Sequence, residues 1–556
     1  MAASSEMFAQ PFDSSRKLTF VVLSLIILIA VVLLWTRLYT TLIYNRSLRQ
    51  YAGLSKVEKQ IVQPPQVPYT LPFLGNALAF LAPYPGQYWR NLFKTHPRDT
   101  GSCTLVLGGR KTHILFSSHA VESLFKNKQL SRHEMDRHLI NKVFDLPLAE
   151  VDRYYGSGHS EEHMNKEFLL KTERVNELTA HFSRVLAERL ETDAKLIDPT
   201  EPMGLFAWLR DRMFTASTTA LMGEHLLVMY PDLCADFWAF DREMLGFFFE
   251  TPKLLMQDAH KRRTKMLDKL EEWNKAMLEQ SKDHTPLDPT NDVAWEPLYG
   301  SRLDRARQLY YAECGLSMRA RSGLDLGLLF GLSSNAIPAT GWILLHILDH
   351  ASNATLYDRI MAELYTAQHA DGSLDVPALI VQPLLLSVYH EVLRLYGDVL
   401  VTRDVDRELL LPLDDAGQRT VRLPKGGLVM APSWLGHHDA GAWDREEAPV
   451  DTFYAERFLT RDPVTGRDSF TLSGTTGKWF PFGGGKTMCP GRVFARQEVL
   501  AAVAMVLLGF EIEVKGFIDG KGKATKSFPG LRSSYQGSGV LVMEGDMLVT
   551  IKQKKR

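Results

Sequence analysis

The chain has 556 residues, of which 45% are hydrophobic, and its formal net charge at pH 7 is −1. This composition excludes a largely disordered chain, and the near-neutral charge gives no general attraction for nucleic acid. The four cysteines form no Cys-x-x-Cys pair, which excludes zinc-ribbon and thioredoxin-type sites, and so few cysteines in so long a chain favour a reducing compartment.

An uncharged segment of 18 residues, Leu18–Trp35, is just long enough to span a membrane as a helix. A cleaved signal peptide is the alternative, but its apolar region should be shorter and followed by a small-residue cleavage site. More basic residues follow the segment than precede it, which predicts a cytosolic location for the rest of the chain. We therefore expect a short tail (1–17), a transmembrane anchor (18–43), a proline-rich linker or hinge (44–72) and one catalytic domain (73–556).

The segment after the anchor contains four prolines between Pro64 and Pro72. Prolines this dense predict a stiff, extended connector that holds the domain at a fixed attitude to the membrane, with a simple linker as the alternative. Further on, Gly101–Ser118 has two β-type runs around Gly108-Gly109, which predicts a hairpin.

Helical patterns dominate the middle and the end of the domain. The segments with this pattern are Glu161–Lys282, about Leu324–Leu348, Gln382–Gly397 and Val493–Glu511. The apolar run Gly323–Ser334 is too short to span a membrane and is predicted to be a buried helix. Short strand-like runs alternate with turns from Val399 to Met430. The expected fold is mainly α with a smaller β portion.

The stretch WFPFGGGKTMCPGR, Trp479–Arg492, is compatible with two kinds of site. Its Gly-Lys-Thr sequence suggests a phosphate-binding loop. That loop requires a glycine where this chain has Phe480, whose bulk blocks the close approach of a phosphate. The alternative is a metal site built on Cys489. One cysteine cannot form a zinc or iron–sulfur site alone, whereas it can be the axial ligand of a haem.

The spacing around this cysteine fits F-x-x-G-x-x-x-C-x-G, with Phe482, Gly485, Cys489 and Gly491 at the four fixed positions. Glycines let the backbone wrap a thiolate so that amides can point at the sulfur. A helix that begins near Pro490 would place its positive end beside the thiolate and lower the cysteine pKa.

Two further patterns precede the cysteine. Glu391 and Arg394 form E-x-x-R on a predicted helix, where residues three apart share a face and can bond each other and a third group. The third group would be Arg457 in FYAERF. An E-x-x-R pair alone is most often a surface ion pair, but the three motifs together, in this order and spacing, resemble those of the cytochrome P450 family. The resemblance extends from about Pro64 to the C-terminus.

The resemblance implies a cytochrome P450 fold behind a single N-terminal transmembrane helix. It implies haem b (iron protoporphyrin IX) as cofactor, with Cys489 as the axial iron ligand and Phe482, Gly485 and Gly491 around it. The arginine that the family places two residues before the cysteine is Thr487 here. Arg403 and the neighbouring Lys486 are therefore the candidates to face the haem propionates.

A Trp-x-x-x-Arg helix that the family uses near the propionates is also missing. His163, Lys166 and Lys171 stand in that region instead, with a solvated helix face as the alternative interpretation for each.

The distal helix, Leu328–Trp342, departs from the family pattern further. Most members carry an acid–threonine pair that relays protons during O2 activation, and Asn335 and Ala336 occupy those positions here. Pro338 should kink this helix. The pattern N-x-x-P-A-x-x-W resembles the branch that contains cholesterol 7α-hydroxylase, sterol 12α-hydroxylase and prostacyclin synthase.

These departures leave two enzymatic mechanisms open. In the favoured one, a monooxygenase uses O2 and electrons from NADPH-cytochrome P450 reductase, and protons arrive through water held by Asn335, Ser334 or Thr340, or through a substrate hydroxyl. In the other, a redox-independent isomerase similar to prostacyclin synthase needs no proton relay. A haem protein that binds without turnover is a third, non-enzymatic class.

The resemblance and the anchor together imply a lipophilic substrate of the steroid or terpenoid kind, a role in secondary metabolism, and a single-pass location in the endoplasmic reticulum membrane with the catalytic domain in the cytosol. No nucleic-acid partner is expected. Lys478, Arg492 and Arg496 are candidates for docking the reductase, with ordinary surface charge as the alternative. The aromatic stretch Phe237–Glu250 would line a pocket or entry channel, or belong to the core.

Overall fold

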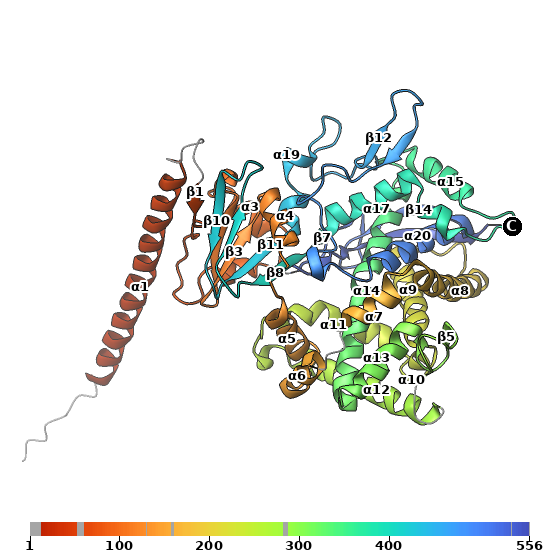
Figure 1. The fold of residues 1–556 in the computed structure, drawn as a ribbon, viewed down its shortest axis with the longest axis horizontal. Helices are drawn as coiled ribbons and strands as arrows, with labels where there is room; N and C mark the ends of the chain where they lie inside the picture. Colours follow the sequence, from red (N-terminus) through yellow and green to blue (C-terminus); the bar gives the residue numbers. More distant parts are fainter. Residues whose placement is uncertain are drawn as a thin grey trace, which may run out of the picture.

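The computed structural model describes residues 13–52, 60–128, 130–156, 161–281, 287–534 and 536–554. Within them, a helix-rich lobe and a sheet-rich lobe form one body, and a long N-terminal helix stands beside the sheet-rich lobe (Figure 1). The expected fold, mainly α with a smaller β portion, is confirmed. Residues 1–12 of the expected tail and 53–59 of the expected linker lie outside the described residues.

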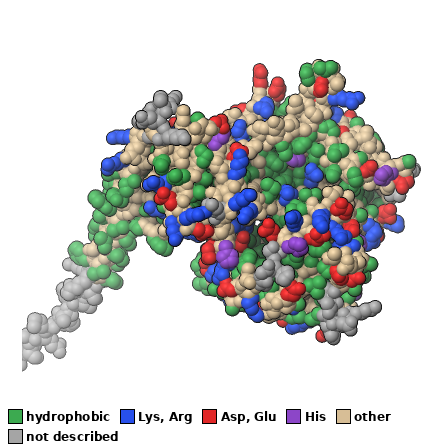
Figure 2. Space-filling model, viewed as in Figure 1, with side chains coloured by type: hydrophobic (Ala, Val, Ile, Leu, Met, Phe, Trp, Pro, Cys, Tyr) green, Lys and Arg blue, Asp and Glu red, His purple; other side chains and the backbone are tan. Residues whose placement is uncertain are grey.

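The N-terminal helix is α1 (Asp13–Ala52), 40 residues long. Its segment Leu18–Tyr51 is long and apolar enough to cross a membrane, and an 18-residue window within it has a mean hydropathy of 3.1. Figure 2 shows hydrophobic side chains along the face of this helix that is in view. Residues 44–52, which we expected in the linker, continue the helix because no glycine or proline precedes Gly53. The helix is a candidate membrane anchor.

Side-chain contacts fasten the far end of α1 to the body. The Thr40 hydroxyl donates to the carbonyl of Tyr69 (3.1 Å), and the Tyr44 hydroxyl lies 2.9 Å from Nδ1 of His96. Thr40, Tyr44 and His96 are all buried. Burial lowers the pKa of His96 to about 4, so its ring is neutral in this contact at pH 7.

The sheet-rich lobe is built on a four-stranded sheet of order β2-β3-β11-β8. Its strands are β2 (Ser102–Leu107), β3 (Arg110–Leu115), β8 (Leu400–Asp404) and β11 (Leu428–Pro432). The β2–β3 hairpin predicted from the sequence is confirmed. Both residues of its turn, Gly108 and Gly109, have positive φ (56° and 81°), as a two-residue turn with the twist of its strands requires.

Shorter elements surround this sheet. A second sheet has the order β1-β10-β9, with β1 (Gln60–Val62), β9 (Leu409–Pro412) and β10 (Arg419–Leu423). The nearby helices are α2 (Ala77–Phe80), α3 (Gln87–Leu92), η1 (Arg98–Thr100), α4 (Ser118–Lys126), α18 (Ser433–His437) and α19 (Ala440–Trp443). The strand-like runs predicted between Val399 and Met430 are therefore β8 to β11.

The helix-rich lobe contains the segments that the sequence predicts as helical. Its helices are α5 (His133–Lys142), α6 (Leu148–Gly156), α7 (Glu161–Leu169), α8 (Thr172–Leu196), α9 (Leu205–Met222), α10 (His225–Met229), α11 (Leu233–Phe248), η2 (Lys253–Leu255), α12 (Gln257–Gln280), α13 (Arg302–Glu313), α14 (Met318–Leu348), α15 (Leu356–Thr366), α16 (Val376–Leu379), α17 (Pro383–Tyr396) and α20 (Arg492–Gly509). Two short pairs, β5 (Trp295–Glu296) with β6 (Gly300–Ser301) and β12 (Leu459–Arg461) with β13 (Asp468–Phe470), complete the lobe.

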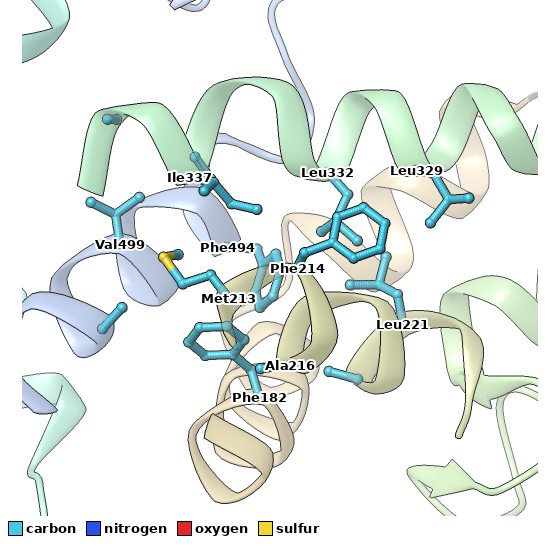
Figure 3. Packing of buried hydrophobic residues seen from close by; sticks show 14 of the residues in the cluster. Phe182, Met213, Phe214, Ala216, Leu221, Leu329, Leu332, Ile337, Phe494 and Val499 are labelled. Carbon is cyan, nitrogen blue, oxygen red and sulfur yellow. The ribbon is translucent and has the colours of Figure 1, made fainter. Parts of the chain in front are cut away.

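Helix α14 lies at the centre of this lobe and packs against α9, α12, α17 and α20. Figure 3 shows Phe214 of α9, Leu332 and Ile337 of α14 and Phe494 of α20 directed into one apolar cluster. Burying each such side chain contributes roughly 1.5–3 kcal/mol relative to exposure. Although α14 is apolar enough to be a candidate membrane span, most of it is buried, which confirms the prediction of a buried helix.

After α20 the chain forms a second group of strands. One sheet has the order β15-β14-β19-β4, with β4 (Met203–Gly204), β14 (Phe510–Ile518), β15 (Ala524–Thr525) and β19 (Asp546–Gln553). The pairing of β16 (Gly530–Leu531) with β18 (Met543–Glu544) closes a loop, Arg532–Val542, which we call the C-terminal loop. Within it, β17 (Gly539–Val540) pairs with β7 (Gly397–Asp398), directly after α17.

The C-terminal loop is held by a buried carboxyl group. Asp398 accepts a hydrogen bond from the Gly537 N–H (3.1 Å) and is fully buried. Burial raises its pKa from 3.8 to about 7, and the Gly537 N–H offsets part of this effect.

We therefore expect Asp398 to lower stability as the pH rises from about 4 to about 7. In this window the folded chain keeps a proton that the unfolded chain loses, so stability falls by up to about 1.4 kcal/mol per pH unit from this group. Asp398→Asn should therefore unfold at a higher urea concentration than wild type at pH 8 and show little gain at pH 4. Equal gains at both pH values would contradict this assignment, and Asp415→Asn, at an exposed carboxylate, is the control.

Candidate active site

The cysteine loop lies between Trp479 and α20 and turns back on itself. Gly483 and Gly485 have positive φ (71° and 68°), a conformation that glycine adopts at no steric cost. The Cys489 N–H donates to the Phe482 carbonyl (2.9 Å), which closes the loop. The three-residue turn η4 (Gly485–Thr487) lies inside it, so Lys486 is exposed on this turn.

Helix α4 packs tightly under the loop. A Cβ atom on Gly484 would lie 2.4 Å from the ring of Phe125, and one on Gly485 would lie 2.5 Å from the Phe125 carbonyl oxygen. The Phe125 and Phe480 rings also meet edge to face, with centroids 5.4 Å apart. These contacts explain why glycines occupy this stretch: the loop is pressed onto α4, and there is no room for side chains.

Cys489 is accessible, whereas Cys103 and Cys314 are buried and Cys234 is half-buried. Burial still raises the pKa of its thiol, because protein surrounds it on most sides, while the N–H groups of Gly491 and Arg492 lower it. A sulfur that is accessible from one side and surrounded by protein on the others is suited to binding a cofactor that covers its open side. The two N–H groups stabilise the thiolate form, which is the form that ligates iron.

Positive charge gathers beside the loop. Arg403 of β8 is buried and donates to the carbonyls of Thr402 (2.7 Å) and Gly484 (2.8 Å). Burial and the Arg132 guanidinium together lower its pKa to about 10, although Asp136 opposes them. Two guanidinium groups against one carboxylate leave a net positive site, which suits the propionates of a haem.

Arg132 was missed by the sequence analysis because it stands in no motif, and only the fold brings it beside Arg403. The candidates from the missing Trp-x-x-x-Arg helix, His163, Lys166 and Lys171, are all exposed. Near the cysteine loop, Lys478, Arg492 and Arg496 are partly exposed.

The E-x-x-R residues and Arg457 are brought together in a fully buried cluster. The Glu391 carboxylate accepts hydrogen bonds from Nε (2.7 Å) and Nη2 (2.9 Å) of Arg394 and from Nε of Arg457 (2.9 Å). The Tyr454 N–H also donates to the carboxylate (3.1 Å). The cluster joins α17 to the segment before β12.

His437 connects this cluster to the cysteine loop. Arg394 Nη1 donates to the His437 carbonyl (2.8 Å), and the Phe480 N–H donates to His437 Nε2 (3.1 Å). Burial, aided by His438 and Arg394, holds the pKa of His437 well below its ordinary value. Its neutral ring can therefore accept at Nε2 while Nδ1 faces the Gly397 carbonyl (3.3 Å). No sequence motif marks this histidine.

The polar side chains of α14 are engaged locally. Asn335 Oδ1 accepts the N–H of Val540 (2.8 Å), and its Nδ2 donates to the Ser334 hydroxyl (3.4 Å). The Thr340 hydroxyl, fully buried, donates to the carbonyl of Ala336 (2.9 Å), itself a buried residue. Asn335 thus fixes the C-terminal loop to α14.

A cavity of about 230 Å³ adjoins this part of α14. Ser334 and Val540 form one side of it, and Asp241, Met244 and Leu245 of α11 form another. The stretch Phe237–Glu250 therefore contributes both to the core, through Phe237 and Phe240, and to a pocket.

Comparisons with known proteins agree on one family. The model of the family described as Cytochrome P450 matches residues 65–527. The cytochrome P450 monooxygenase fsoE of Humicola fuscoatra is 28% identical over 543 residues, covering 89% of this chain and 88% of its own. Mouse cytochrome P450 7B1 is 25% identical over 81% of this chain and 85% of its own. The structure of retinoic acid bound cyanobacterial CYP120A1 aligns with a TM-score of 0.61 at 19% identity, over 88% of this chain and 99% of that one.

We expect Glu391→Gln to destabilise the fold by about 3–5 kcal/mol, because it leaves two buried guanidinium groups without their counter-charge. Urea unfolding would measure the loss. Asp258→Asn is the matched control, since its ion pair with Lys261 (3.3 Å) is exposed and should contribute less than about 1 kcal/mol. A loss no larger than that of the control would contradict the structural role of the cluster.

Gly485→Ala should impair the cysteine loop more than strain alone explains. Gly474→Ala is the control, because Gly474 also has positive φ (78°) but open space around its Cα. Each substitution costs about 1–2 kcal/mol of backbone strain, and only the first adds the collision with Phe125. The haem content of purified protein should fall in Gly485→Ala and stay near wild type in Gly474→Ala; equal content in both would show that the close packing is unimportant.

Proposed function

Because this chain belongs to the cytochrome P450 family and is a haem-dependent monooxygenase, we propose that it hydroxylates a lipophilic substrate of the steroid or terpenoid class. One oxygen atom of O2 enters a C–H bond of the substrate and the other leaves as water. NADPH supplies the two electrons through a membrane-bound NADPH-cytochrome P450 reductase. The substrate class is supported by the N-x-x-P-A-x-x-W pattern around Asn335 and Pro338 and by the candidate anchor α1, and the fungal monooxygenases among the relatives fit a role in secondary metabolism.

The observation that carries the proposal is the accessible sulfur of Cys489, in a loop whose N–H groups stabilise a thiolate. We assign Cys489 as the axial ligand of the haem iron. The cofactor supplies the site where O2 is activated. Phe482 closes the loop through its carbonyl, Gly485 lets the loop lie against Phe125, and a Cβ on Gly491 would lie 3.9 Å from the Cys489 sulfur. Arg403, Arg132 and Lys486 supply positive charge for the propionates.

For proton delivery we assign Ser334. It lines the cavity, and its hydroxyl donates to the carbonyl of Phe330 (2.7 Å), which leaves its oxygen able to accept from water. Thr340 is fully buried and bonded within the helix, and Asn335 is occupied by Val540. Both therefore serve to shape α14, and Ala336 brings no hydroxyl. A substrate hydroxyl is a further source of protons.

Location follows from the candidate anchor. We propose that α1 places the enzyme in the endoplasmic reticulum membrane as a single-pass protein, with its body in the cytosol, where the reductase reaches the basic residues Lys478, Arg492 and Arg496. Their partial exposure beside the cysteine loop supports this docking face.

The ferrous protein under carbon monoxide should show the long-wavelength Soret band of thiolate-ligated haem, and Cys489→Ala should lose it. Cys234→Ala, at a half-buried cysteine outside the loop, should keep it. With reductase and a ligand that shifts the Soret band, NADPH consumption should match the hydroxylated product formed. Product formation without NADPH consumption would replace this proposal with the isomerase mechanism, and retention of the band in Cys489→Ala would overturn the ligand assignment.

A further inference from the structure

We infer that the substrate already carries a hydroxyl group when it binds, and that Asp241 and Arg532 hold this hydroxyl at the wall of the cavity. This inference rests on the proposed function and adds to it the chemistry of the substrate. It also places the enzyme after a reaction that introduces a hydroxyl group.

Charged and polar side chains form part of the cavity wall. Arg532 of the C-terminal loop pairs with Asp241 of α11, Nη2 to Oδ2 at 3.2 Å, and both line the cavity. Ser533, Ser534 and Ser538 line it as well. Pockets for small molecules are mostly apolar with a few placed polar groups that fix orientation. A charged pair in such a wall therefore indicates a polar group on the ligand.

The pair is largely removed from water. The side chain of Asp241 is only 10% exposed and that of Arg532 26%. Burial raises the pKa of the Asp241 carboxyl, and the Arg532 guanidinium offsets part of this rise. A hydrocarbon placed against the pair would remove water from the remaining hydrogen-bond donors and acceptors of the pair. It would offer no hydrogen bonds in place of those to water, which is unfavourable.

A hydroxyl group matches the pair better than other functions do. The Asp241 carboxylate can accept further hydrogen bonds beyond the one from Arg532, and the guanidinium has further N–H donors. A hydroxyl both donates and accepts, so it satisfies both partners at once. A carboxylate would meet Arg532, and Arg242 also lines the cavity, but at the pair itself it would be repelled by Asp241.

The pair is fixed before a ligand arrives. The Arg532 N–H donates to the Val542 carbonyl (2.9 Å), next to the β16–β18 pairing. The next residue, Ser533, donates a hydrogen bond from its hydroxyl to the carbonyl of Pro83 (2.7 Å). Such preorganisation lowers the entropic cost of binding a polar group.

The same cavity reaches the part of α14 proposed for proton delivery. Ser334 lines it, and so does Val540, whose N–H bonds to Asn335. A lipid whose hydroxyl rests on the Arg532–Asp241 pair thus extends toward Ser334. The reaction that supplies this substrate must leave a hydroxyl group, as an earlier oxygenation or a cyclisation that ends in hydration does.

The test uses the holoenzyme and ligands that share one skeleton. Abietadiene, abietadienol and abietic acid carry a methyl, a primary alcohol and a carboxylic acid at the same carbon, and 5α-androstane with 5α-androstan-3β-ol gives a second series. Affinities are measured from the shift of the Soret band at pH 8. Wild type should bind at least one alcohol about tenfold or more tightly than its hydrocarbon, and abietadienol more tightly than abietic acid.

Two conservative variants isolate the pair. In Asp241→Asn, which keeps the size of the side chain, abietic acid should gain about tenfold relative to abietadienol, because the repelling charge is gone. In Arg532→Gln the preference for the alcohol over the hydrocarbon should fall by a similar factor. Arg98→Gln is the control, since its pair with Asp439 (3.6 Å) is half-exposed and outside the cavity lining.

Hydrocarbons bound as tightly as alcohols, unchanged ratios in both variants, or no binding of either alcohol would overturn the inference. The proposed function is judged separately, by the carbon monoxide spectrum and by NADPH-coupled turnover of any compound that binds. A thiolate band with turnover but no alcohol preference would refute the inference alone, whereas loss of the band or of NADPH coupling would refute the proposed function.

Discussion

The carboxylate of Glu391 lies out of contact with water between two guanidinium groups, and the position of the cysteine loop depends on it. Arg394 and Arg457 neutralise it and carry its influence outward: Arg394 bonds to the His437 carbonyl, and His437 accepts the N–H of Phe480 at the start of the loop. Because buried charges tolerate little displacement, this series of bonds determines where Cys489 lies relative to α17. Buried ion pairs of this kind contribute little to the net free energy of unfolding. We therefore assign the Glu391 cluster a different role, which is to position the cysteine loop.

A second set of contacts defines the opposite side of the site. Asn335 stands at the family's acid position and was a candidate to hold water for proton delivery, yet in the structure it fastens the C-terminal loop to α14 through Val540. A Cβ on Gly539 would lie 2.2 Å from Asn335 Oδ1, so this contact also requires glycine in the partner strand. The side chain at the family's acid position therefore has a structural task here, and Arg532 is brought to the cavity by the loop that Asn335 holds.

The sequence predicted the parts of the fold that repeat a local pattern. The long helices followed from apolar spacing and the β2–β3 hairpin from Gly108-Gly109, since both depend on neighbours in the chain. The cysteine and E-x-x-R motifs were found because their spacing is characteristic. Arg132, His437 and the Asp241–Arg532 pair could not be found, because each depends on segments that only the folded chain brings together. The helix that carries the predicted anchor (18–43) continues to Ala52, because the polar residues that follow the apolar run still favour a helix.

The contacts of Thr40 and Tyr44 with the body have a consequence for encounters in the membrane. A 40-residue helix is about 60 Å long, roughly twice the thickness of the hydrocarbon core, so it is long enough for one end to span a bilayer while the other is bonded to the body. Arg37 adds a bond to the Pro68 carbonyl (3.0 Å). At the membrane location proposed above, an enzyme held on this stiff helix would not tumble. Its search for the proposed membrane-bound reductase would be reduced to lateral diffusion and rotation about the membrane normal, with the cysteine loop kept at one height above the surface.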